Sequence, residues 1–411
     1  MLLEASMHSR PSPPGGTGRG AQTSRPRIKI LCFVPQLGGG GAEMHLLRLL
    51  THFDRTKFQP LLAVARPGGS YEARLPADII ARCCGWPRVP SSTLRMQTSI
   101  PALRRLLAAE QPEVIISFLD HTTAASAAAL ESLPHPRPLF IAAIQNNLEK
   151  TLDHLPQWTR GWLPRAIVSA YSRADRIIAL SSGVAEGLAQ LIPETRSRIS
   201  VIHNAGYDQQ VERLALEQPA LPTPKGPWFL GCGRLTAQKD FSTLIRAFAR
   251  IRHECAAELW ILGEGELRGK LEREIAALGL GSCVRLPGFV KNPFAFMARA
   301  SAFVLSSQWE GFGNVVTEAM ACGTPVISTD CPHGPREILE DGRWGSLVPV
   351  ANVDGLAEAM RAALANPSQH QARASAARSQ AVRFEAGRIT RQYEQAMLSA
   401  LPEHQESSRQ P

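Results

Sequence analysis

Short apolar runs alternate with helical stretches along this 411-residue chain. The clearest runs are Ile28–Val34, Val114–Phe118 and Leu139–Ile144 in the first half, and Trp228–Cys232 and Ala302–Leu305 in the second. Strands that alternate with helices favour parallel sheets covered by helices on both faces. The pattern therefore predicts an α/β protein.

A proline-rich segment divides the alternation into two series. Residues 217–227 contain four prolines, a composition typical of a linker. We therefore predict two doubly wound, Rossmann-like domains facing a central cleft, over residues 27–206 and 207–384. Residues 1–26 are rich in Pro, Gly and Ser, lack the apolar centre of a secretory signal, and are predicted to be a disordered lead.

The bulk composition excludes some classes of protein. No run of about eighteen apolar residues occurs, so no transmembrane helix is expected. The net charge is +9, but aromatic content is only 6% and no known nucleic-acid-reading motif is present, so no nucleic-acid partner is expected.

One basic cluster surrounds apolar residues near position 165. It contains Arg160, Arg165, Arg173 and Arg176, opposed only by Asp175. A basic amphipathic surface can adhere to anionic membranes. The alternative is an ordinary solvated face, and the sequence leaves both open.

The segment SSQWEGFGNVVTE (residues 306–318) follows the apolar run Ala302–Leu305. Glu310 then lies at the carboxyl end of a predicted parallel strand, where open α/β sheets bind ligands. A helix that begins near Val315 directs its first amide groups to the same place, which suits a phosphate. Glu318 falls about one turn into that helix. The segment therefore offers an anion site flanked by two acceptors for sugar hydroxyls.

Two cations follow the first strand of the second series. Arg234 and Lys239 lie just past Trp228–Cys232, before the next helix, where they can neutralise a diphosphate. A divalent metal fills this role in other enzymes, but the chain contains no Asp-x-Asp pair, and none of its eight cysteines forms a C-x-x-C pair. We therefore predict phosphate binding without a metal. Taken alone, an Arg and a Lys on a loop are more often solvated surface charges, and it is the Glu310–Glu318 segment that favours the phosphate site.

Two features of the first series point to the expected cleft. Gly40 and Gly41 end a glycine run after the first strand, and such a run lets the backbone approach a phosphate closely. Its spacing fits neither a Walker loop nor a clean dinucleotide fingerprint. His121 follows Val114–Phe118, where it can position or deprotonate a hydroxyl. A flexible turn and a structural histidine are the alternatives.

Loops after the next two strands of the second series are expected on the same rim as Arg234. Gly263 lies in the first of these loops and Val290 in the second. Backbone groups near Val290 are suited to the edge of a nucleobase. Ordinary turns between strand and helix are the alternative for both loops.

Together these segments resemble the retaining, nucleotide-sugar-dependent glycosyltransferases of family 4, which have the fold called GT-B. The segments that carry the resemblance are GGGGAE (38–43), GRLTAQKD (233–240), LPGFVKNP (286–293) and SSQWEGFGNVVTEAMACGTPVIST (306–329). The likeness extends from about residue 27 to about residue 401. Two glutamates eight residues apart, combined with G-R-L-x-x-x-K-D, make a specific combination.

The resemblance implies roles for individual residues. Arg234 and Lys239 would bind the donor diphosphate. Glu310 would contact the transferred sugar near the reacting carbon, and Glu318 would bind the ribose hydroxyls. His121 would contact the sugar or the acceptor. The further nucleotide-sugar contacts implied are Gly40, Gly41, Gly233, Gly263, Val290, Phe312, Gly313, Asn314 and Val315.

The resemblance also implies that a last helix, residues 385–401, crosses back to complete the first domain. One departure concerns the connection between the domains. Ala205 follows His203-Asn204 where many members have proline, which leaves the interdomain angle open.

The implied reaction is retaining, metal-independent and cofactor-free hexosyl transfer from a nucleotide-diphosphate sugar to a hydroxyl of a lipid-linked or oligosaccharide acceptor, in cell-surface polysaccharide or lipopolysaccharide synthesis. UDP is the expected carrier and GDP remains open. The expected location is the cytoplasm, at the inner face of the plasma membrane. A sugar-nucleotide epimerase of the same architecture and a non-catalytic nucleotide-sugar-binding module remain as alternatives. An epimerase needs no acceptor, and a non-catalytic module is expected to lack Glu310 or Lys239.

Overall fold

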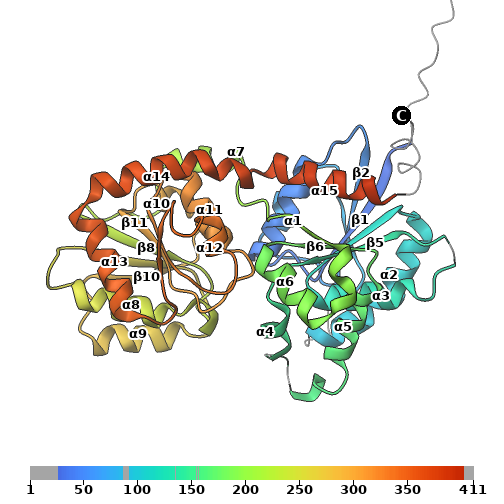
Figure 1. Cartoon of the computed structure of the whole chain (residues 1–411), viewed down its shortest axis with the longest axis horizontal. Helices are drawn as coiled ribbons and strands as arrows, with labels where there is room; N and C mark the ends of the chain where they lie inside the picture. The colour runs from blue at the N-terminus through green and yellow to red at the C-terminus, as the bar shows by residue number, and fades with distance from the viewer. Residues whose placement is uncertain (1–25, 87–91, 135, 154, 156, 402–411) are drawn as a thin grey trace, which may run out of the picture.

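The computed structural model describes residues 26–86, 92–134, 136–153, 155 and 157–401. It shows two α/β domains side by side along the long axis of the molecule, with the last two long helices lying along one side of both (Figure 1). The predicted pair of doubly wound domains is confirmed.

The first domain is built on a seven-stranded parallel sheet with the order β3-β2-β1-β4-β5-β6-β7. The central strands are almost entirely buried, because helices cover both faces of the sheet. The strands are β1 (Ile28–Val34), β2 (Phe58–Val64), β3 (Ala81–Cys83), β4 (Val114–Phe118), β5 (Leu139–Ile144), β6 (Arg176–Ala179) and β7 (Ile199–Val201).

Helices α1 and α15 pack on one face of this sheet, and α2, α3 and α5 pack on the other. On the first face, Leu46 and Leu49 of α1 share a core with Ile389, Tyr393 and Met397 of α15. The helices are α1 (Gly41–His52), α2 (Ser92–Glu110), α3 (Asp120–Leu130), α4 (Leu148–Asp153), α5 (Leu163–Arg173), α6 (Ser182–Leu191) and α15 (Ala386–Ala400), with 3-10 turns η1 (Glu72–Arg74), η2 (Gln157–Thr159) and η3 (Pro193–Arg198).

The second domain repeats this plan with a six-stranded parallel sheet of order β10-β9-β8-β11-β12-β13. Its strands are β8 (Trp228–Cys232), β9 (Glu258–Leu262), β10 (Val284–Gly288), β11 (Ala302–Leu305), β12 (Val326–Thr329) and β13 (Ser346–Val348). Its helices are α8 (Phe241–Ile251), α9 (Arg268–Ala277), α10 (Phe294–Met297), α11 (Asn314–Ala321), α12 (Pro335–Ile338), α13 (Val353–Ala365) and α14 (Pro367–Ala381), with 3-10 turns η4 (Ala237–Lys239) and η5 (Val382–Phe384).

The chain passes between the domains twice. A hinge segment, residues 202–208, leads from β7 to α7 (Gln209–Leu216), which packs on α10 of the second domain. Residues 217–227 then form neither helix nor strand, as their proline content predicts. The return runs from α14 through η5 to α15 (Figure 1).

The five strands named from the sequence have the bounds that were predicted for them. Strands β3 and β13 were not predicted. Each has three residues at the edge of its sheet, which is too short for an apolar run to stand out.

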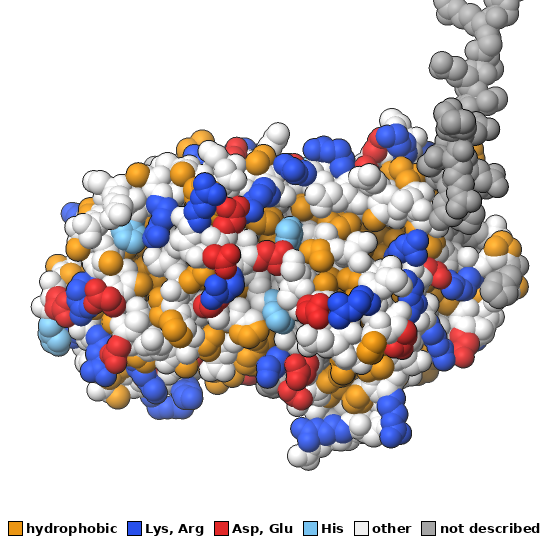
Figure 2. Space-filling model, viewed as in Figure 1, with side chains coloured by type: hydrophobic (Ala, Val, Ile, Leu, Met, Phe, Trp, Pro, Cys, Tyr) orange, Lys and Arg blue, Asp and Glu red, His pale blue; other side chains and the backbone are white. Residues whose placement is uncertain are grey.

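The predicted basic cluster is divided in the structure. Arg160 and Arg165 are exposed at a tip that also contains Trp158 (55% exposed) and Trp162 (38% exposed). Figure 2 shows Lys and Arg side chains at this tip, below α4 and α5. Of the other two arginines, Arg173 ends α5 and Arg176 begins β6, away from the tip. Within the described residues, no helix is long and apolar enough to cross a membrane.

Arg173 and Arg176 make local contacts. Arg173 forms an ion pair with Glu131 at 3.2 Å, and Arg176 donates to the carbonyl of Asp175 at 2.9 Å. The exposed basic surface at the tip, which we call the Trp–Arg tip, therefore consists of Trp158, Arg160, Trp162 and Arg165.

Candidate active site

Backbone hydrogen bonds join the loops at the carboxyl ends of β8, β9 and β10 into one rim of the sheet. The amide of Gly233 donates to the carbonyl of Leu262 at 3.0 Å, and the amide of Gly263 donates to the carbonyl of Gly288 at 2.9 Å. Gly263 has φ +139°, and a Cβ there would lie 1.9 Å from the carbonyl oxygen of Gly233, so only glycine fits. Val290 follows on the same rim, as predicted.

Lys239, in the loop after β8, forms an ion pair with Glu310, in the loop after the neighbouring strand β11. The Lys239 Nζ lies 2.5 Å from the Glu310 Oε1, and the Ser307 hydroxyl donates to the same oxygen at 2.6 Å. Glu310 is only 6% exposed. A buried carboxylate with a cation and a hydroxyl on one oxygen is held in place by both contacts. The sequence predicted both residues for the site but not their direct contact.

The loop around Glu310 is also fixed through its backbone. The Glu310 amide donates to the carbonyl of Pro332 at 2.7 Å, and the His333 amide donates to the carbonyl of Glu310 at 2.8 Å. On the other side, the Gln238 side-chain amide donates to the carbonyl of Trp309 at 2.9 Å. The loops that follow β8, β11 and β12 therefore position Glu310 together. Arg234 is exposed on the first of these loops.

Helix α11 begins where the sequence placed a phosphate site. Its N-cap is Gly313, with φ +95°, a left-handed conformation that favours glycine. The Asn314 side-chain amide donates to the carbonyl of Gly41 in the first domain at 2.9 Å. The glycine loop therefore meets the start of α11 directly. Phe312 is buried with its ring beside those of His203 and Phe384, while Val315 packs on the core from α11.

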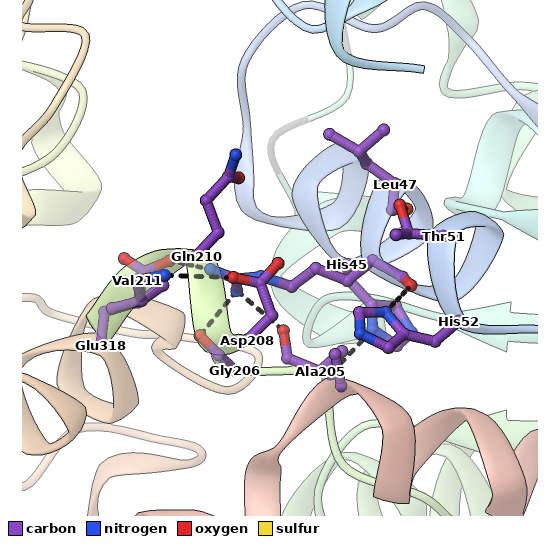
Figure 3. A network of polar contacts seen from close by, with 12 residues as sticks. His45, Leu47, Thr51, His52, Ala205, Gly206, Asp208, Gln210, Val211 and Glu318 are labelled. Carbon is purple, nitrogen blue, oxygen red and sulfur yellow. Dashed lines mark hydrogen bonds and ion pairs between the residues drawn. The ribbon is translucent and has the colours of Figure 1, made fainter. Parts of the chain in front are cut away.

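Glu318 lies in the second turn of α11 and is paired across the domains. Its Oε1 accepts a hydrogen bond from Arg48 Nη2 on α1 at 3.1 Å (Figure 3). Burial raises the pKa of the Glu318 carboxyl, and the Arg48 cation opposes this by lowering it. Arg48 was not predicted from the sequence. An arginine in the middle of MHLLRLL, a helical run that is apolar apart from His45, is the signal that could have found it.

His121 lies in the first turn of α3, directly after β4. The preceding Leu119 has φ +78°, an uncommon conformation for a residue other than glycine and one that clusters at functional sites. Burial lowers the pKa of His121, which favours the neutral ring. The adjacent Asp120 is engaged by the Tyr171 hydroxyl at 2.6 Å. Among the described residues, no hydrogen bond or ion pair joins His121 to Glu310 or to the cations of the rim.

Three further polar residues of the first domain were missed by sequence reasoning. Glu43 of α1 lies close enough to Arg234 for this cation to lower its pKa, although burial outweighs it and the pKa is raised. Gln145, directly after β5, is 5% exposed and neither atom of its amide finds a partner among the described residues. The Asn204 Oδ1 is likewise buried and unpartnered. The position of Gln145 after a buried strand was the available signal.

The segment after β12, which includes α12, makes a second set of contacts with the first domain. The Glu337 carboxylate accepts hydrogen bonds from the amide and hydroxyl of Ser182 at 2.9 and 3.0 Å, and lies 2.6 Å from His203 Nε2. His333 Nε2 lies 3.2 Å from the Asn147 amide nitrogen. Within the described part of the chain, no group of three His, Cys, Asp or Glu side chains is arranged to hold a metal ion.

Two models of known protein families match this chain. Residues 39–205 match the model described as Glycosyltransferase Family 4, and residues 226–366 match the model described as Glycosyl transferases group 1. The chain belongs to the glycosyltransferases. The predicted family is thereby confirmed.

This glycosyltransferase is similar to curated bacterial proteins. One is the N-acetylgalactosamine-N,N'-diacetylbacillosaminyl-diphospho-undecaprenol 4-alpha-N-acetylgalactosaminyltransferase of Campylobacter jejuni, to which it is 34% identical over 221 residues. This match covers 54% of this chain and 59% of that protein. The chain is 34% identical over 204 residues to the lipopolysaccharide core biosynthesis glycosyltransferase LpsE of Rhizobium meliloti, over 49% of this chain and 57% of that protein. The matched part therefore spans less than two thirds of either relative.

Solved structures confirm the GT-B fold of this glycosyltransferase. The Anabaena protein HepE, solved in complex with UDP and glucose, superimposes with a TM-score of 0.76 over 91% of this chain and 100% of that one, at 21% identity.

Proposed function

We propose that this glycosyltransferase transfers a hexose from a UDP-linked sugar to a hydroxyl of a lipid-linked or oligosaccharide acceptor, with retention of configuration and without a metal. The observation that carries the proposal is the Lys239–Glu310 pair, which lies a few residues before the start of α11, where Asn314 contacts Gly41 of the first domain. A cation, a carboxylate and the first amides of a helix, close together, match a sugar diphosphate.

The chemistry of each group supports a position for the donor. Arg234, Lys239 and the first amides of α11 bind the diphosphate, with the backbone from Phe312 to Val315 against the distal phosphate. Glu310 accepts hydrogen bonds from hydroxyls of the transferred sugar. Glu318 accepts from the ribose. Uracil as the base is supported by the neighbouring structure solved with UDP.

In the proposed reaction, the bond between the anomeric carbon and the phosphate oxygen breaks as the acceptor oxygen forms a bond on the same face of the sugar. The acceptor proton passes to the leaving phosphate oxygen. Arg234, Lys239 and the positive end of α11 stabilise the charge that develops on the diphosphate. Lys239 and Ser307 hold one oxygen of Glu310, so this carboxylate serves as an acceptor for hydroxyls rather than as a nucleophile. His121, neutral because of burial, is proposed to contact the sugar or acceptor hydroxyl.

The acceptor is proposed to be carried by a membrane. One relative is named for a diphospho-undecaprenol acceptor, and the Trp–Arg tip combines aromatic and cationic side chains as interfacial anchors do. We place the protein in the cytoplasm, in peripheral contact with the inner face of the plasma membrane.

Co-sedimentation with anionic vesicles tests this contact. Arg160→Glu with Arg165→Glu should abolish binding to vesicles of phosphatidylglycerol and phosphatidylcholine. The matched control, Arg388→Glu with Arg391→Glu, changes the same charge on the exposed side of α15 and should leave binding intact. Unchanged binding by the first variant would refute the membrane contact.

A donor screen in the presence of EDTA tests the reaction itself. UDP- and GDP-sugars are compared by thermal shift and by release of the nucleoside diphosphate. One UDP-sugar should stabilise the protein and release UDP slowly without metal, and faster once an acceptor is added. Conversion of the donor to an epimer without any acceptor would favour the epimerase, and binding without any turnover would favour the non-catalytic module. The anomeric configuration of the product, read by NMR, decides whether the transfer is retaining.

A further inference from the structure

Arg48 is a buried arginine that joins three parts of the molecule. It is 2% exposed, and every residue of α1 from Met44 to Leu50 is buried with it. Its Nη1 donates to the carbonyls of Ala205 and Gly206 in the hinge segment, at 2.9 and 2.6 Å. Its Nη2 donates to Glu318 Oε1 on α11 at 3.1 Å (Figure 3).

A gain in stability is a weak reason for an arginine at this position. Removing a guanidinium from water is costly, and replacing a buried ion pair by apolar side chains of similar size is often neutral or stabilising. The neighbouring residues of α1 are mostly leucines, so an apolar side chain would continue the core. The Nε of Arg48 has no hydrogen-bond partner in the described structure, and lies 3.7 Å from Asp208 Oδ2. A cation held at this cost indicates a role in the site.

Glu318 is left with one oxygen free by this arrangement. Arg48 binds Oε1, and among the described residues no hydrogen bond to Oε2 is found. An ionised carboxylate only accepts hydrogen bonds, and the adjacent Arg48 cation favours this state against the effect of burial, which raises the pKa of Glu318. The pair therefore presents one oriented acceptor oxygen at the place where the donor ribose is proposed to lie.

We propose that Arg48 is a positioning residue for the donor nucleotide: it fixes the Glu318 carboxylate so that Oε2 accepts hydrogen bonds from the ribose hydroxyls. This inference rests on the proposed function, in which Glu318 contacts the ribose. Because Arg48 belongs to the first domain and Glu318 to the second, the ribose site is complete only while α1 lies against α11. The two hinge carbonyls hold the guanidinium at that junction.

The test measures recognition of the ribose rather than overall affinity. Calorimetric titration compares UDP with 2′,3′-dideoxy-UDP, which lacks both hydroxyls, and GDP with 2′,3′-dideoxy-GDP in parallel. Hydrogen bonds to a charged acceptor make the wild-type protein bind the ribose form at least about tenfold more tightly. In Arg48→Met this ratio should fall to near one, because Glu318 is no longer held. A general loss of structure would instead weaken both nucleotides alike.

Arg55→Met is the matched control. Arg55 also donates to one carboxylate, that of Asp78, and to two backbone carbonyls, but all of its partners lie in the first domain. The Arg55→Met variant should keep the wild-type ratio of affinities for the ribose and dideoxyribose nucleotides. If Arg48→Met does not fold, Arg48→Lys keeps the charge with a single nitrogen and should give an intermediate ratio.

The outcomes separate the two proposals. A folded Arg48→Met or Arg48→Lys variant that keeps the wild-type ratio overturns the role of Arg48 and leaves the proposed function standing. A wild-type protein that binds UDP and dideoxy-UDP equally removes the ribose contact of Glu318, and with it this inference. A wild-type protein that binds neither UDP nor GDP overturns the proposed function itself.

Discussion

The Nδ1 of His45 accepts a hydrogen bond from the backbone N–H of Ala205 at 2.9 Å. The other ring nitrogen, Nε2, lies 3.0 Å from the hydroxyl of Tyr393 on α15. Because a backbone amide only donates, Nδ1 must be unprotonated. Proline has no N–H, so this contact depends on the alanine that stands where many family members have proline. One buried histidine of α1 thus ties the hinge segment to the last helix.

Ala205→Pro should lower the free energy of unfolding by about 1–3 kcal/mol, because it leaves the buried acceptor of His45 unpaired. Thermal and urea denaturation measure the loss. In a His45→Leu background the same substitution should cost little, since the acceptor is gone. Equal costs in the two backgrounds would show that the hydrogen bond contributes nothing.

Stability should depend on pH through His45. Burial, aided by the nearby Arg48 cation, lowers the pKa of His45 from 6.5 to about 3. Between these values the unfolded chain binds more protons than the folded one, so stability rises with pH and is lost as pH falls from about 6.5 toward 3.

Within that window, the titration of His45 changes the free energy of unfolding by about 1.4 kcal/mol per pH unit. His45→Gln should remove it, as measured by urea unfolding at several pH values. Tyr393→Phe is the control, because it deletes the neighbouring hydroxyl but keeps the titrating ring. A His45→Gln variant with the wild-type slope would contradict the assignment.

Lys239→Ala should reduce turnover by a factor of about 10²–10³, the usual cost of losing one charge contact to the transition state. It also leaves the buried Glu310 without its cation, so the protein should lose stability. Adding Glu310→Gln should restore stability but not turnover. Lys270→Ala, on the exposed face of α9, serves as the control. A folded Lys239→Ala enzyme with full turnover would refute the site.

Glu337→Ala should loosen the second junction between the domains. Its carboxylate is half-buried, which raises its pKa, but hydrogen bonds from His203 and Ser182 outweigh this effect and the pKa is lowered. Without this acceptor, the backbone amide of Ser182 should exchange faster with deuterated water. Glu340→Ala, a short distance along the chain, should leave that amide unchanged. Equal protection in the Glu337→Ala variant would contradict the prediction.

Most of the fold could be predicted because local pattern determines it. The central strands are buried on both faces and appear as apolar runs, and their bounds agree with prediction. The edge strands β3 and β13 owe their conformation to a neighbouring strand rather than to their own composition. Nothing in three residues distinguishes such a strand from a loop.

The candidate site could likewise be predicted only in part. Lys239 and Glu310 were predicted because each lies at the end of a strand that can be identified from the sequence. The contact between Arg48 and Glu318 could not be, because it joins residues 270 positions apart in different domains. The buried amide of Gln145 could not be predicted either, because a side chain without a hydrogen-bond partner among the described residues is recognised only once its surroundings are known.

The last helix has a consequence for how the chain is made. Ile389, Tyr393 and Met397 of α15 belong to the core of the first domain. Synthesis proceeds from the N-terminus, so the ribosome must complete the entire second domain before this helix emerges. Until then the α1 face of the first sheet lacks its cover and His45 lacks the tyrosine beside it. The domain that is translated first is therefore the domain that is finished last.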